Sequence, residues 1–166
     1  MTQHEVPHAT VSLKQEERTE NHWLGTADEL VVLFLYDGAV SDPRHVEVTS
    51  RVLQRTSLNL GRTCPFLVVL RSHAGRPPDS SVRNAVRESF EKSNRYVSRA
   101  AIVILGDGFA PSIHRGVVTG IYALAGPKVS LTVHSTIAEG LAKLENSERA
   151  SFMPLLETLV KLSEVA

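Results

Sequence analysis

The chain has 166 residues, with 18 basic and 18 acidic side chains and a formal net charge of +0. Hydrophobic residues make up 42% of the sequence and charged residues 22%, as in ordinary globular proteins. This composition excludes a wholly disordered chain, a collagen and a polybasic nucleic-acid-binding tail. A chain of this length buries about 70% of the surface that its unfolded form exposes, so its core needs neither a metal nor a disulfide.

The cysteine content and the apolar runs bear on where the protein resides. Cys64 is the single cysteine, so no disulfide can form within the chain. The longest apolar runs, such as Leu30–Tyr36, are far shorter than the roughly 20 residues that a membrane-spanning helix needs. The N-terminal residues lack the basic start and the apolar stretch of a secretory signal. We therefore predict a cytoplasmic protein with no transmembrane segment.

Polar residues dominate the first 20 positions, which predicts a flexible N-terminal tail over residues 1–20. Residues 21–166 are expected to form a single α/β domain that ends in an amphipathic helix. Within it, Leu30–Tyr36 is apolar at every position, as is typical of a strand covered on both faces. We expect the segment around Trp23 to pair with this strand as the other arm of a hairpin.

Strand-like and helix-like segments alternate along the rest of the chain. Strands are predicted at 30–36, 65–70, 100–105 and 129–133, and helices at 42–60, from 79 or 80 onwards, after Gly108, at 137–144 and at 148–163. Because parallel strands require right-handed helical crossovers, this order predicts a small α/β sandwich with a central, largely parallel (mixed) sheet of four to five strands and helices on its faces. By analogy, we place the first of the four strands beside both the second and the third, and the last at an edge.

The loops at the carboxyl ends of the strands are the usual ligand-binding side of an open α/β sheet. Gly106 and Gly108 form a strand-to-helix turn without the third glycine of a dinucleotide motif or the lysine of a phosphate-binding loop. A plain turn is therefore favoured over a phosphate site. If these loops bind a small molecule, an anion or a lipid, the candidate residues are Gly106, Gly108, Ser112, His73 and His114.

The sequence carries no strong signature of catalysis or metal binding. Its seven histidines, His22 and His45 among them, form no helical i,i+4 pair and no ligand cluster, so we expect surface residues and no metal site. No G-x-S-x-G motif occurs, and Cys64 is expected to be a small buried thiol rather than a nucleophile. The zero net charge argues against nucleic-acid binding. We predict that the chain is not an enzyme and uses no cofactor.

The residues Asp79-Ser80-Ser81 stand where a helix is predicted to begin. A serine at a helix start has an exposed hydroxyl, and a phosphate added there is favoured by the helix dipole. Phosphorylation at this place could switch the binding of a partner without unfolding the domain. The spacing alone favours the simpler interpretation that the serine is an N-cap.

The strand Phe66–Leu70 followed by Asp79-Ser80-Ser81 resembles the STAS family of anti-sigma-factor antagonists and its SpoIIAA-like relatives. The segment from Ala100 to Val133 is similar to the later half of SpoIIAA-like proteins, and the resemblance covers about residues 23–144. It implies that Ser80 is the serine phosphorylated by a partner kinase and that Asp79 helps to set the loop. The family usually has glycine where this chain has Val82.

From these observations we expect a non-catalytic regulatory or protein-interaction module with a protein partner, docked at Asp79, Ser80 and Ser81. The alternative is a domain that binds a small molecule, an anion or a lipid at the carboxyl-end loops. Homodimerisation through the C-terminal helix is compatible with both. We nevertheless expect the leucines of that helix to cover the sheet instead: Leu155, Leu156, Leu159 and Leu162.

Overall fold

The structure, a computed structural model, describes residues 12–36, 44–71, 80–106, 129–145 and 151–164. Its strands form one six-stranded sheet, in which the spatial order of the strands follows the sequence. The strands are β1 (Lys14–Arg18), β2 (His22–Ala27), β3 (Leu30–Leu35), β4 (Cys64–Arg71), β5 (Val97–Leu105) and β6 (Ser130–His134). The pairs β1–β2 and β2–β3 are antiparallel, and β3 to β6 are parallel. The predicted mixed α/β class is confirmed, but the sheet has six strands rather than four to five.

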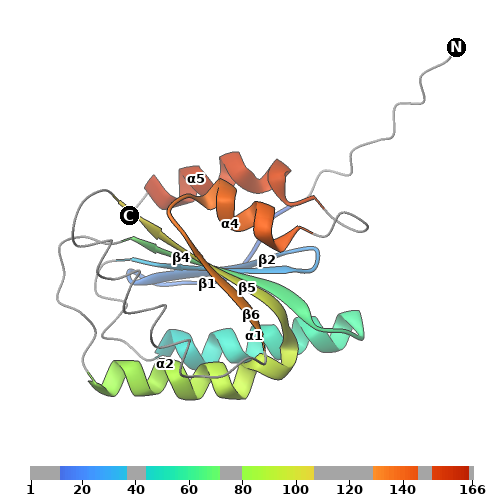
Figure 1. Ribbon diagram of the computed structural model, residues 1–166, viewed down its shortest axis with the longest axis vertical. Coiled ribbons are helices and arrows are strands. Elements are labelled where there is room, and N and C mark those ends of the chain that lie inside the picture. Colours follow the sequence, from blue (N-terminus) through green and yellow to red (C-terminus); the bar gives the residue numbers. More distant parts are fainter. Residues whose placement is uncertain (1–11, 37–43, 72–79, 107–128, 146–150, 165–166) are drawn as a thin grey trace, which may run out of the picture.

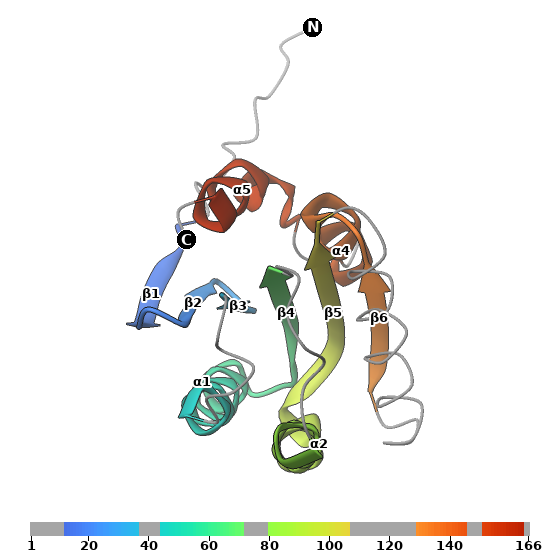
Figure 2. The ribbon, with the colours of Figure 1, turned by 90° about the vertical axis from the view of Figure 1, so that its left-hand side faces the viewer.

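Helices cover both faces of this sheet (Figures 1 and 2). The described helices are α1 (Arg44–Leu60), α2 (Ser80–Ser93), α4 (Ile137–Leu144) and α5 (Leu156–Glu164), with 3-10 turns η2 (Asn94–Tyr96) and η3 (Met153–Leu155). Helices α1 and α2 lie on one face, and α4 and α5 lie on the other (Figure 2). No helix in the described ranges is long and apolar enough to cross a membrane.

The sheet therefore separates two hydrophobic cores. Alternate residues of a strand point to opposite faces, so Leu33 belongs to the core under α1 and α2, whereas its neighbour Phe34 belongs to the core under α4 and α5. All six residues of β3 are buried, as expected for a strand covered on both sides. Trp23 of β2 packs edge-on against Phe34, with ring centroids 5.9 Å apart. The predicted hairpin between the Trp23 segment and β3 is confirmed.

Strand β1 corrects the expected tail. We predicted a flexible segment over residues 1–20, but residues 14–18 form an edge strand that pairs with β2. The strand contains only polar and charged residues, Lys-Gln-Glu-Glu-Arg, so it has no apolar periodicity by which to be found. Charged side chains are common on edge strands because they discourage pairing with another chain.

The strand order also differs from the expected one. We placed the first predicted strand, β3, beside both the second and the third: its pairing with the second, β4, is confirmed, but its other neighbour is β2 rather than β5. Because β2 occupies one side of β3, strands β4, β5 and β6 follow one another on its other side. The last strand, β6, lies at the edge as predicted.

Helix α4 spans the predicted residues 137–144, and its start is defined by a capping box. The Thr136 hydroxyl accepts a hydrogen bond from the backbone N–H of Glu139, whose carboxylate accepts one from the backbone N–H of Thr136. The last helix is shorter than the predicted 148–163, because Pro154 stands in the 3-10 turn that precedes α5. Leu155 and Leu159 are buried in the core, as we expected of this helix.

Candidate functional site

Three of the predicted site residues fall within the described ranges. Ser80 is the first residue of α2 and is exposed, and Ser81 follows it in the helix. Gly106 is exposed and directly follows β5. The other candidates, Asp79, His73, Gly108, Ser112 and His114, lie outside the described residues. Helix α2 is the crossover from β4 to β5, which places its start on the path that leaves the carboxyl end of β4.

Gly106 has a backbone φ of +112°, a conformation that favours glycine over residues with a side chain. The glycine directly follows Leu105, the last residue of β5. The rest of the predicted turn and the helix predicted after Gly108 lie outside the described residues. Between Ser80 and Gly106 the structure shows no hydrogen bond, so these two described candidates are not joined directly.

Cys64 is a buried structural thiol, as predicted. The side chain is inaccessible to solvent at the start of β4. Its Sγ is 3.4 Å from the carbonyl oxygen of Tyr96 and 3.9 Å from that of Leu53, and it donates to both. Burial raises the pKa of Cys64 to about 11. Because the thiolate is the reactive form, the raised pKa and the burial of Cys64 both lower its reactivity near neutral pH.

The expectation that the histidines lie on the surface is wrong for two of them. His22 and His45 are 3% and 5% exposed. His22 begins β2 and is paired with Leu35, at the carboxyl end of β3. His45 is the second residue of α1, and the two imidazole rings lie 6.1 Å apart, centroid to centroid. The sequence separates them by a strand and a loop, so neither spacing nor periodicity indicates the pair.

A β-bulge brings two carboxylates to the side of the sheet that α1 covers. The pairing of β1 with β2 shifts between Gln15 and Glu17, which leaves Glu16 as the extra residue. Strict alternation would send Glu16 and Glu17 to opposite faces, but a bulge can turn two successive side chains to the same side. Glu17 contacts His22, and Glu16 contacts Arg55 of α1. Gln15, on the other side, accepts a hydrogen bond from the Trp23 indole at 2.9 Å.

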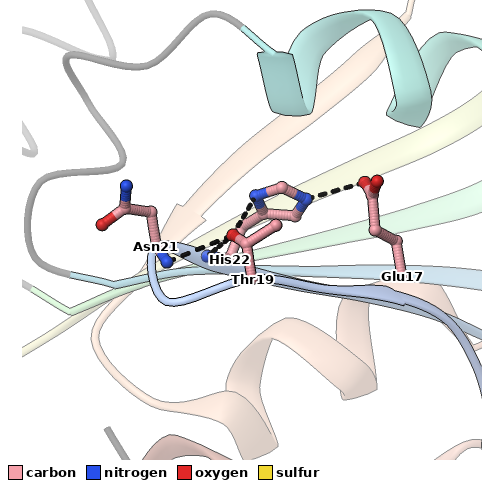
Figure 3. Close-up of polar contacts among 4 residues, drawn as sticks. All are labelled: Glu17, Thr19, Asn21 and His22. Carbon is pink, nitrogen blue, oxygen red and sulfur yellow. Dashed lines mark hydrogen bonds and ion pairs between the residues drawn. The ribbon is translucent and has the colours of Figure 1, made fainter.

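Four residues around the turn between β1 and β2, Glu17, Thr19, Asn21 and His22, form what we call the His22 cluster (Figure 3). The His22 ring lies between Glu17 and Thr19. Its Nε2 is 2.8 Å from the Glu17 carboxylate, and its Nδ1 is 2.9 Å from the Thr19 hydroxyl. The same hydroxyl oxygen accepts hydrogen bonds from the backbone N–H groups of Asn21 and His22, at 3.2 and 3.1 Å.

These contacts favour one tautomer of His22. An ionised carboxylate only accepts hydrogen bonds, so Nε2 carries a proton and donates it to Glu17. The Thr19 oxygen has two lone pairs, and the backbone N–H groups of Asn21 and His22 use both. The hydroxyl can then donate its own proton to Nδ1, an arrangement that matches an imidazole with its proton on Nε2. Both ring nitrogens of His22 lie within hydrogen-bond distance of groups at the turn.

Ion pairs attach α1 and the segment after it to the strands beneath. Arg55 contacts the Glu16 carboxylate at 2.6 Å, and Lys14 contacts it at 3.3 Å. Burial opposes ionisation of Glu16, but the hydrogen bonds and charges of Arg55 and Lys14 outweigh it and hold its pKa below the ordinary value. Beyond the end of α1, Arg62 pairs with Glu29 in the turn between β2 and β3.

The described part of the chain contains no group of three or more histidine, cysteine or acidic residues that could hold a metal ion. Comparison of the chain with protein-family models, curated proteins and solved structures finds no match. Among the described candidates Ser80 and Gly106 are exposed, whereas Cys64 and His22 are buried and bond within the fold.

Proposed function

We propose that the chain is a non-catalytic regulatory module of STAS or SpoIIAA-like type, which binds another protein through the start of α2 and is switched by phosphorylation of Ser80. The observation that carries the proposal is the position of Ser80. It is exposed, and it is the first residue of a 14-residue helix that follows a strand of the parallel part of the sheet.

Charges of both signs flank this helix start in the sequence, because Asp79 precedes Ser80 and Arg83 follows it. The first turn of α2 contains no acidic residue. A phosphate on Ser80 would add about −1.5 to −2 charges near neutral pH, where the positive end of the helix dipole favours negative charge. The modification would therefore be tolerated by the fold while it changes the surface that a partner meets.

The properties of the reactive side chains support a role without catalysis. The Cys64 thiol is buried and holds its proton at neutral pH. The nitrogens of His22 bond to Glu17 and Thr19. These groups stabilise the fold, so the proposal rests on binding rather than on chemistry at either residue.

The test compares two serines at opposite ends of parallel strands. Ser130 is exposed and begins β6, at the amino end of the parallel strands, so Ser130→Asp is a matched control for Ser80→Asp. Wild-type chain and both variants are immobilised, and proteins retained from a lysate of the source cells are quantified by mass spectrometry. We expect a partner whose retention changes at least about tenfold, or about 1.4 kcal/mol, with Ser80→Asp and stays constant with Ser130→Asp.

The purified partner is then titrated against the three chains to obtain dissociation constants. Equal affinities for all three would contradict the proposed switch. A thermal-shift panel of nucleotides, inorganic phosphate and lipids separates this function from ligand binding. A ligand present at about 100 times its dissociation constant adds about 2.7 kcal/mol, so a clear shift would favour a ligand-binding domain instead.

A further inference from the structure

We draw no further inference here: the strongest candidate, the exposed apolar side chains Met153 and Val160 on the final helical segment, carries nothing because the described part of the chain does not show what covers them.

Discussion

The carboxylate of Glu17 accepts a hydrogen bond from Nε2 of His22 over 2.8 Å, and this bond joins the edge strand β1 to β2. The imidazole is almost completely buried, while about a third of the Glu17 side chain is exposed. The bond therefore spans the boundary between the core and the solvent. It holds the turn that begins β2 at the point where the ring of His45 approaches from α1.

If His22 is neutral, its bond to Glu17 does not require a charge on the acceptor. A glutamine carbonyl can accept the same Nε2 proton, so we expect Glu17→Gln to change the free energy of unfolding by less than about 0.5 kcal/mol. Glu17→Ala removes the acceptor and should cost about 1 kcal/mol. Urea unfolding of both variants measures the difference.

The tautomer itself is visible by nuclear magnetic resonance. Long-range proton–nitrogen spectra of the wild-type chain at neutral pH should show a protonated Nε2 and an unprotonated Nδ1 for His22. Two protonated nitrogens, or an equal loss of stability in Glu17→Gln and Glu17→Ala, would mean that the contact is an ion pair with an imidazolium.

The contacts of Glu16 predict a dependence of stability on pH. Its folded-state pKa is below the ordinary value of 4.5, despite the opposing effect of burial. At a pH between the folded-state and unfolded-state pKa values of Glu16, the unfolded chain binds more protons than the folded one. The stabilisation that Glu16 contributes is therefore complete above the unfolded-state pKa and is lost as pH falls through the folded-state pKa. We expect the wild type to lose more stability than Glu16→Gln between about pH 6 and about pH 3.5.

Glu47→Gln is the matched control, because Glu47 is an exposed glutamate on α1. Its removal should leave the pH dependence close to that of the wild type. Parallel curves of unfolding free energy against pH for the wild type and Glu16→Gln would show that Arg55 and Lys14 do not stabilise the charged form of Glu16.

Cys64 should resist thiol reagents while the protein is folded. Its thiol is inaccessible to solvent, and burial raises its pKa to about 11. Labelling by an aromatic disulfide reagent at neutral pH should therefore be slow, and it should accelerate in urea as the chain unfolds. Stopped-flow absorbance measures both rates. Rapid, complete labelling of the native protein would contradict the buried position at the start of β4.

Gly140 is the residue at which α4 lies close against strands β4 and β5 of the sheet. An ideal Cβ at this position would lie 2.7 Å from Cγ2 of Val103 and 3.2 Å from Cδ1 of Leu67. Glycine to alanine in the interior of a helix ordinarily stabilises by about 1 kcal/mol, because alanine has the better helix propensity. Here we expect Gly140→Ala to destabilise by about 1–3 kcal/mol, since the valine side chain is stiff and buried.

Val103→Ala removes the atom that the new methyl group would meet. In that background Gly140→Ala should cost less than in the wild type, and thermal or urea unfolding of the four chains gives the coupling energy. Stabilisation by Gly140→Ala in the wild type would show that the helix can move away from β5 at no cost.

Several elements of the fold follow from local sequence. Residues 30–35, 64–71 and 97–105 include continuous apolar runs, because strands buried on both faces leave no polar side to alternate. Helix α4 begins where predicted because Thr136 can satisfy a backbone donor at the helix start. Helix α2 begins at Ser80, in agreement with the predicted start at residue 79 or 80.

The remaining features depend on contacts between distant residues. Strand β1 is stabilised by its pairing with β2 and by polar partners such as Arg55 on α1, and its own residues have no apolar pattern. His22 is buried because a bulge places Glu17 beside it and α1 brings His45 over it. The sequence by itself determined the described strands and helices other than β1, because periodicity and caps are local. Only the tertiary structure decided the strand order, the edge strand β1 and the burial of His22 and His45, because each of them depends on which surfaces meet.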